Sequence, residues 1–259
     1  MNVFDELFAR LTPDSLIRDA AANGEGITIA VVDSGIDRSV IETRHPHAKP
    51  IEGAIFAPAF APYLGKQSSI HGTIVADILL RIAPGAKLYS ADVFGSLGNS
   101  EVETVVAAIR HAMDVWNAKI INLSLGIPEH KLQLLPKRNQ LLRVIEEAYF
   151  RDVLVFAAAN NEHPVSKSYP AAFATPLISV DKGLFKDPLQ FLYQLREQIE
   201  FQAHSRGYLG MFAQEPATSW ATPHLAGIAA RILTLRPKLK PFEMKTLLYW
   251  MFPGNSASG

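Results

Sequence analysis

The strongest constraint on the fold is the alternation, along the chain, of short apolar runs with longer stretches of helical periodicity. Nearly continuous apolar runs are typical of strands buried on both faces of a parallel sheet. Strands that alternate with helices predict a three-layer α/β fold, with a mainly parallel central sheet flanked by helices. The predicted strands are Ile27–Val32, Leu88–Val93, Ile120–Leu125, Val153–Ala158 and Leu177–Val180, and the predicted helices are Thr73–Ile82, Val102–Trp116 and Gln140–Phe150.

The composition fits a globular domain and excludes several kinds of site. The hydrophobic fraction is 48% and the charged fraction is 19%, enough for a sizeable core. The chain has 25 basic (Lys and Arg) and 25 acidic residues, so no long-range field would recruit nucleic acid or an anionic membrane. The absence of cysteine excludes disulfides, thiolate zinc sites and a cysteine nucleophile.

The sequence predicts one domain behind a short N-terminal segment. We expect residues 1–25 to form an amphipathic helix and a connection, and residues 26–259 to form a single domain without repeats or linkers. Acidic residues interrupt the first apolar residues, unlike the apolar stretch of a secretory signal. No apolar run approaches the roughly 20 residues of a membrane span. We therefore expect a cytoplasmic location and no membrane partner.

Three short motifs, each at the edge of a predicted element, carry side chains suited to nucleophilic catalysis. Asp33 follows the first strand, His71 opens a helix, and Ser219 opens the helix that ends near Leu235. A serine hydroxyl needs a neighbouring base, a histidine can take its proton, and a buried carboxylate can orient that histidine. Each residue alone fits a structural turn or helix cap equally well. The combination predicts a catalytic triad.

The sequence resembles the subtilisin-like serine peptidases from about Gly26 to Leu235, and its Asp-His-Ser order is that of subtilisin. The segments at 121–126 and 157–162 extend the resemblance beyond the triad. It implies that Asn161 donates from its side chain to the developing oxyanion, together with the backbone N–H of Ser219. The implied substrate-binding residues are Gly98, Asn99, Ser100, Ser124, Leu125, Gly126, Ala157, Ala158, Ala159 and Asn160.

The chain also departs from this family's pattern. Ala217 and Asn160 stand where glycine is usual, and Trp220 stands where methionine is more frequent, which puts a large ring beside the site. The calcium-binding loop of many secreted relatives is missing between the first long helix and the next strand. We expect no metal and no cofactor, and we expect His45 and His47 to lie in a surface loop rather than in a metal site.

The resemblance implies a serine endopeptidase that acts on a peptide or protein. Secreted relatives carry a longer inhibitory pro-segment, so we expect a selective or regulated intracellular processing protease. Two alternatives stay open, namely a macrocyclase or transpeptidase that uses the same acyl-enzyme, and a catalytically silent binding module. The segment Leu189–Ile199 has helical apolar spacing, which predicts either a core helix or a docking surface for a regulatory partner.

Overall fold

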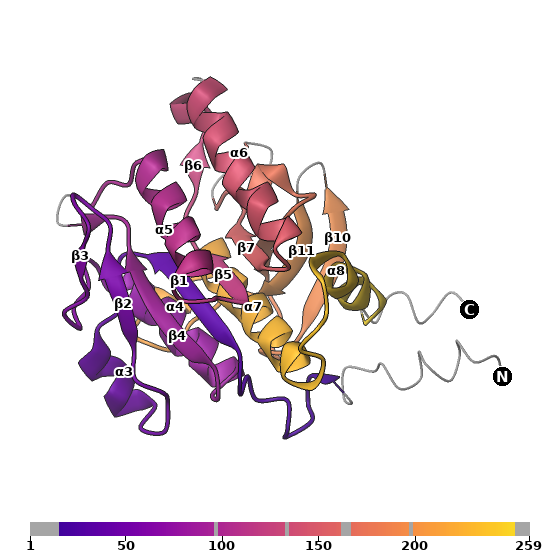
Figure 1. Cartoon of the computed structure of the whole chain (residues 1–259). Coiled ribbons are helices and arrows are strands. Elements are labelled where there is room, and N and C mark those ends of the chain that lie inside the picture. Colours follow the sequence, from indigo (N-terminus) through magenta and orange to yellow (C-terminus); the bar gives the residue numbers. More distant parts are fainter. Residues whose placement is uncertain (1–15, 96–97, 133–134, 162–166, 197–198, 252–259) are drawn as a thin grey trace.

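A nine-stranded sheet forms the centre of the computed structural model, which describes residues 16–95, 98–132, 135–161, 167–196 and 199–251 (Figure 1). The strand order is β10-β11-β9-β7-β5-β1-β4-β2-β3, and a separate two-stranded sheet pairs β6 with β8. The strands are β1 (Thr28–Asp33), β2 (Glu52–Ile55), β3 (Ala61–Pro62), β4 (Lys87–Asp92), β5 (Ile120–Leu123), β6 (Ile127–Pro128), β7 (Leu154–Ala158), β8 (Ser168–Tyr169), β9 (Ile178–Gly183), β10 (Phe191–Arg196) and β11 (Ile199–His204).

The large sheet is mainly parallel, as predicted. Its pairings are parallel except at the two edges, where β10 pairs antiparallel with β11, and β3 with β2. The five strands predicted from apolar runs are β1, β4, β5, β7 and β9, and all five are confirmed with small differences at their ends. The outer strands β2, β3, β10 and β11 had no comparable apolar run and were not predicted.

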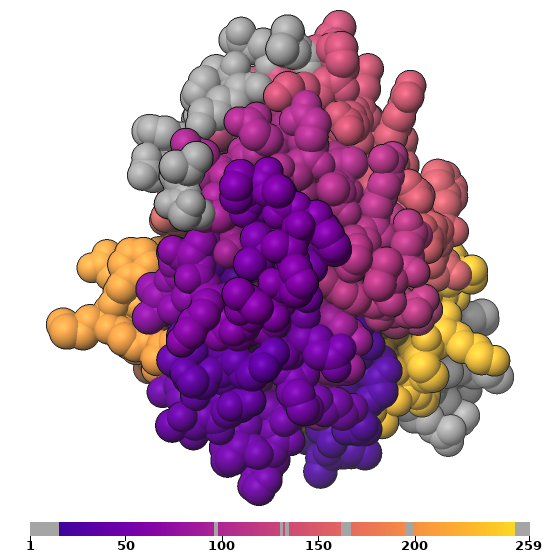
Figure 2. Space-filling model, turned by 60° about the vertical axis from the view of Figure 1, so that its left-hand side comes forward, coloured from indigo at the N-terminus to yellow at the C-terminus, as the bar shows by residue number. Residues whose placement is uncertain are grey.

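Helices cover both faces of the sheet (Figure 1). On one face α4 packs against α7, and on the other α5 packs against α6. The elements from β1 to α6 form most of the face seen in Figure 2, where they run from indigo to rose. The helices are α3 (Arg38–Arg44), α4 (His71–Ile82), α5 (Val102–Asp114), α6 (Leu135–Phe150), α7 (Thr218–Leu235) and α8 (Pro241–Trp250), and the short 3₁₀ turns are η2 (Glu129–Leu132), η3 (Ala171–Phe173) and η4 (Phe212–Gln214).

Strand β1 shows why the central strands are apolar throughout. Ile29 and Val31 point into the core shared with α4 and α7, whereas Ala30 and Val32 point into the core shared with α5 and α6. Successive side chains of a strand face opposite sides of the sheet, so burial on both faces requires an unbroken apolar run. The three-layer α/β fold predicted from the sequence is thereby confirmed.

The prediction of a helix over Leu189–Ile199 is wrong. This segment contains β10 and the start of β11, which pair as an antiparallel ribbon at the edge of the sheet. Phe191 and Ile199 are buried, and Phe191 belongs to the core under α7. Phe191 and Ile199 therefore pack inward, but from strands rather than from a helix. The helix expected over residues 1–25 lies largely outside the described residues.

Buried Asp77 on α4 corrects the prediction that His45 lies in a surface loop. The His45 side chain is only 14% exposed, and its Nε2 lies 2.8 Å from Asp77 Oδ1. Arg44 donates to both carboxylate oxygens at 2.8 and 3.2 Å, and Arg81 lies 3.4 Å away. Burial alone would raise the pKa of Asp77, but the bonds from His45 and Arg44 lower it to about 2. These contacts join α3 to α4, whereas His47 is exposed.

None of the helices among the described residues combines the length and the apolar character that crossing a bilayer requires. No three histidine, aspartate or glutamate side chains of that part of the chain gather in a way that could hold a metal ion.

Candidate active site

The predicted site residues converge at the carboxyl ends of the central strands. Asp33 is the last residue of β1, and the strand register places it opposite Asp92, the last residue of β4. Ser124 directly follows β5, and Ala159 directly follows β7. These strands are parallel neighbours, so their ends line one edge of the sheet, where ligands of open α/β sheets bind.

Buried Asp33 forms a hydrogen-bonded pair with His71. His71 Nδ1 lies 2.9 Å from Asp33 Oδ1 and 3.0 Å from Oδ2, and Asp33 is 1% exposed. Ser34, which follows in the sequence, donates to Asp33 Oδ1 from its backbone at 2.7 Å and from its hydroxyl at 3.0 Å. A carboxylate can only accept, so the proton of neutral His71 sits on Nδ1 and leaves Nε2 free to act as a base.

Two glycines allow this close approach. A Cβ on Gly72 would lie 2.2 Å from the carbonyl oxygen of Gly35 and 3.3 Å from Asp33 Oδ1. Gly35 itself has φ +80°, a left-handed conformation that disfavours other residues. Glycine at both positions therefore lets the start of α4 dock against the end of β1, and this docking brings His71 to Asp33.

The pKa of His71 is raised above its ordinary value of 6.5. Burial is the largest influence and acts downward, but the charge of Asp33 and the hydrogen bond to it together outweigh burial. The side chain remains 28% exposed. The carboxylate thus favours the imidazolium, the form that a general base reaches once it has accepted a proton.

The serine predicted as nucleophile lies at the start of α7, on a backbone braced by Ser124. Pro223 lies inside this helix and has no N–H to donate to the carbonyl oxygen of Ser219, four residues earlier. The hydroxyl of Ser124 donates to that oxygen instead, at 2.9 Å. Ser124 Oγ in turn accepts from Asn122 Nδ2 at 2.9 Å. A side chain after β5 therefore replaces the missing helical hydrogen bond.

The Ser219 hydroxyl donates to the carbonyl oxygen of Ser124 at 3.3 Å. Among the described residues, no hydrogen bond joins it to His71. Activation therefore requires the hydroxyl to exchange that carbonyl for His71 Nε2, and catalytic hydrogen bonds are often long or misaligned before substrate binds.

The orientation of the Asn161 side chain suits donation to an oxyanion. Its Oδ1 faces the backbone N–H of Thr218 at 3.2 Å and the ammonium of Lys182 at 3.4 Å. Both partners can only donate, so they identify the oxygen and leave the NH₂ group to point elsewhere. Lys182 also donates to the Asn161 carbonyl at 2.8 Å. This lysine could not be predicted from the sequence, because strand β9 brings it in from outside the motif.

A cavity of about 300 Å³ opens beside the triad. It contains two of the predicted substrate-binding residues, Gly98 and Ser124, together with Phe94, which could contact an apolar part of a substrate. Residues 98–100 form a loop rather than a strand, so pairing of Asn99 and Ser100 with an extended substrate stays a prediction. The cavity is lined by Asp33, Ser34, Ser68, Ser69, His71, Phe94, Gly98 and Ser124.

The other predicted substrate-binding residues follow two neighbouring strands. Leu125 and Gly126 continue β5, whereas Ala158, Ala159 and Asn160 end or follow β7. Leu125 is 8% exposed and Gly126 is exposed, so the first segment emerges from the core at this point. Ala157, 0% exposed, belongs to the core under α5 and α6. Their role as walls of a specificity pocket stays a prediction.

The large ring expected beside the site is present. The rings of Trp220 and His71 lie 4.8 Å apart between centroids, with a tilt of 35° between their planes. His224, further along the same helix, is fully buried, and burial lowers its pKa to about 3. Its Nδ1 donates to the Trp220 carbonyl at 2.7 Å, while Tyr208 donates to its Nε2 at 3.0 Å. His224 is therefore structural.

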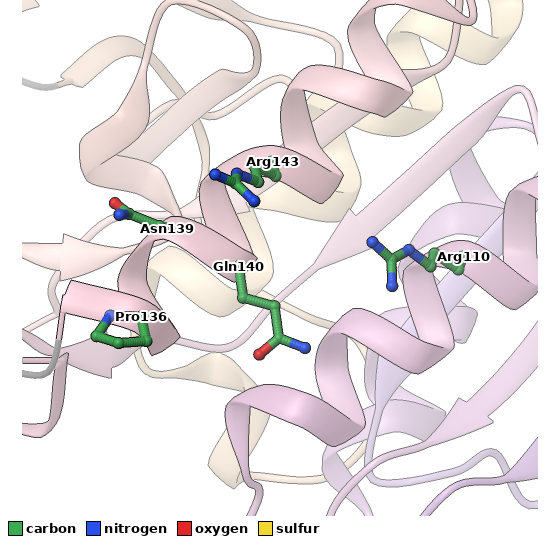
Figure 3. A pocket seen from close by; sticks show the side chains of 5 residues that line it. All are labelled: Arg110, Pro136, Asn139, Gln140 and Arg143. Carbon is green, nitrogen blue, oxygen red and sulfur yellow. The ribbon is translucent and has the colours of Figure 1, made fainter.

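A second cavity, of about 370 Å³, lies between α5 and α6 (Figure 3). Its lining consists of Arg110, Pro136, Asn139, Gln140 and Arg143. It contains no member of the triad and neither Asn161 nor Ser124, so it is separate from the site described above.

Comparisons with known proteins agree with this geometry. The sequence pattern of the Subtilase family matches residues 24–181 and 197–253, so the unmatched stretch contains β10. The chain is 31% identical over 234 residues to Subtilisin E of Bacillus subtilis (strain 168), which covers 83% of this chain and 57% of that protein. It is 28% identical over 240 residues to Subtilisin Savinase of Lederbergia lenta, with 87% and 82% covered. The chain thus spans little more than half of Subtilisin E.

Solved structures share the fold. The S41 psychrophilic protease has a TM-score of 0.71 at 23% identity, covering 91% of this chain and 87% of that one. A lanthipeptide protease has a TM-score of 0.69 at 21% identity, with 92% and 84% covered. At such identities the similarity shows the fold alone.

Proposed function

Because this chain belongs to the subtilase family, we propose that it is a serine endopeptidase, which hydrolyses peptide bonds through an acyl-enzyme on Ser219. The observation that carries the proposal is the hydrogen-bonded Asp33–His71 pair. It fixes the tautomer that leaves Nε2 as a base, at the sheet edge where α7 presents Ser219. The arrangement of Asn161 supports the same function.

The proposed reaction has two halves. His71 Nε2 takes the Ser219 proton as Oγ attacks the scissile carbonyl carbon, and the carbonyl oxygen becomes an oxyanion near the Asn161 amide and the Ser219 N–H. No hydrogen bond engages that N–H within the described residues, as expected in the first turn of a helix. The tetrahedral intermediate collapses, His71 gives its proton to the leaving amine, and Ser219 keeps the acyl group. Water, deprotonated by His71, then attacks the ester, and the released Ser219 oxygen regains a proton.

The proposal includes a preference for an uncharged residue before the scissile bond. The expected walls, 124–126 and 157–159, present alanine, leucine, glycine and serine without a charged side chain to pair with Lys or Asp. A cleavage profile with a strict preference for Lys or Asp would refute this part.

We also propose that activity is selective or regulated, in keeping with the expected intracellular processing role. The Phe94 ring lines the cavity beside the triad, which supports narrow substrate choice. Phe191 and Ile199 are buried, so a partner that binds at 189–199 could not dock on these apolar side chains. It would instead pair with the backbone of β10, which is the last strand of the sheet among the described residues. Broad digestion of casein by the purified chain would contradict selectivity. The cytoplasmic location stays a prediction that cell fractionation tests.

A peptide-library digestion followed by mass spectrometry tests the function, with Ser219→Ala as the matched control. Hydrolysis predicts pairs of fragments whose summed mass exceeds that of the parent peptide by one water. Cyclic or transferred products without that water would assign a macrocyclase or transpeptidase, since an amine would have replaced water at the acyl-enzyme. Turnover that persists in Ser219→Ala would refute the mechanism. Absence of any turnover in the unmodified chain would favour the silent binding module.

A further inference from the structure

We propose that Trp220 is a positioning residue for the general base: the face of its indole supports the His71 imidazole and stabilises the imidazolium formed when His71 takes the proton of Ser219. This inference rests on the function proposed above and adds a residue to it. Trp220 directly follows the nucleophile, so a single turn of α7 supplies both the reacting hydroxyl and a surface for the base.

The first support is the geometry of the two rings. Their centroids lie 4.8 Å apart and their planes are tilted by 35°, so the imidazole lies nearer to parallel than to perpendicular with the indole. A cation within about 6 Å of an aromatic centroid is attracted by the negative face of the ring, most strongly by that of tryptophan. Trp220 is 1% exposed, so little water screens this attraction on the indole side.

The second support is the way Trp220 is held in place. Phe212 meets the indole edge-on, with 5.8 Å between centroids and planes at 89°. The Trp220 carbonyl accepts the His224 Nδ1 hydrogen bond, and Tyr208 fixes the other nitrogen of His224. Arg81 of α4 lies 4.6 Å from the centroid of the Tyr208 ring. Phe212 of η4 therefore contacts the indole itself, while His224 holds the backbone of Trp220.

The third support is the arrangement of charge around His71. Among the described residues, Asp33 of β1 is the charged group that acts on it, through a hydrogen bond to Nδ1. The Trp220 ring of α7 packs against the imidazole, with 4.8 Å between centroids. The two contacts approach from different directions and both favour the protonated ring, so their effects on its pKa have the same sign. Loss of the indole's attraction therefore lowers the pKa of His71.

Fluorinated tryptophan tests this without changing the packing. Biosynthetic incorporation of 5-fluoro- and then 5,7-difluorotryptophan weakens the negative face of the indole while nearly preserving its shape. The NMR titration of His71 then shows a stepwise fall in its pKa. The total fall is smaller than the effect of the whole cation–π attraction, which corresponds to about 0.4 to 1.5 in pKa. The chain has 3 tryptophans, so the same labelling in Trp220→Phe is the matched control and leaves the pKa unchanged. An unchanged pKa in the parent chain, or an equal fall in both chains, would overturn the proposal.

The titration is recorded in a Ser219→Ala background, so it does not depend on hydrolysis. In the active chain, the acid limb of kcat/KM moves down with the NMR value. A stepwise fall in a chain that lacks peptidase activity would support the role of Trp220 and refute the proposed function alone. A second control, Trp116→Phe, replaces an indole that packs under α5 in the other core with a phenyl ring, and it leaves both readouts unchanged.

Discussion

Replacement of Ser124 by alanine tests how the nucleophile is held. The Ser124 hydroxyl donates to the carbonyl oxygen of Ser219, which Pro223 leaves without its helical partner, and it accepts from Asn122 Nδ2. Ser124→Ala removes both bonds at once. The Asn122 side chain is fully buried and its Oδ1 already has no hydrogen-bond partner in the described part of the chain, so relaxation toward water is blocked.

The expected loss follows from those two groups. A buried donor or acceptor left unsatisfied costs about 1–3 kcal/mol, so the two together reduce the free energy of unfolding by about 2–6 kcal/mol. For a domain of this size each kcal/mol lowers Tm by about 2–4 °C. We therefore expect Ser124→Ala to lower Tm by at least about 4 °C.

Ser90 provides the matched control. It lies in β4, is 0% exposed, and its Oγ has no hydrogen-bond partner among the described residues. Ser90→Ala removes the same atom from an equally buried site without breaking a bond, so stability stays unchanged or rises. Urea unfolding followed by fluorescence, in a Ser219→Ala background that prevents self-digestion, gives the free energy of unfolding of each variant. Equal effects of the two substitutions, or a Ser124→Ala chain as stable as the parent, would refute the reasoning.

Three other predictions concern charge and the oxyanion. Only neutral His71 is a base, so kcat/KM rises with pH through a pKa above 6.5, and a rise centred at or below 6.5 would contradict the influence of Asp33. The Asp77 pKa of about 2 lies below its ordinary 3.8, so its ion pairs stabilise the fold above pH 3.8 and lose this effect as pH falls toward 2. Asp77→Asn accordingly costs about 3–5 kcal/mol at pH 7 and progressively less below pH 3.8 in urea unfolding, and a pH-independent cost would contradict the assignment. Asn161→Ala lowers kcat by about 10²–10³, the magnitude known for this donor in subtilisin, with little change in KM. Lys182→Met lowers kcat less. Equal losses in the two variants, or a change confined to KM, would argue against the oxyanion role of Asn161.

The sequence predicted the centre of the fold better than its edge. Strands such as β1 are buried on both faces, so they can be recognised in the sequence as unbroken apolar runs. The segment at 189–199 left an ambiguous record, because its apolar residues fit helical spacing in a short window. Its strand conformation depends on pairing with β11, which in turn pairs with β9. Such pairing is non-local and does not appear in the spacing of one segment.

The candidate site shows the same division. Asp33, His71 and Ser219 could be proposed because each stands in a short motif next to a predicted element. The contact of Lys182 with Asn161 and that of His45 with Asp77 could not, since each joins residues brought together only by the tertiary fold. The hydrogen bond from Ser124 to Ser219 is an intermediate case, because both residues were predicted as site residues but the bond between them was not.

The central claim is that Asp33, His71 and Ser219 form one activated nucleophile. Labelling of the purified chain with a fluorophosphonate probe, followed by peptide mapping, tests it most directly. We predict labelling at Ser219 that is lost in Ser219→Ala and strongly slowed in Asp33→Asn, because the altered partner no longer fixes the His71 tautomer. An unlabelled parent chain, or labelling that persists in Ser219→Ala, would contradict the account.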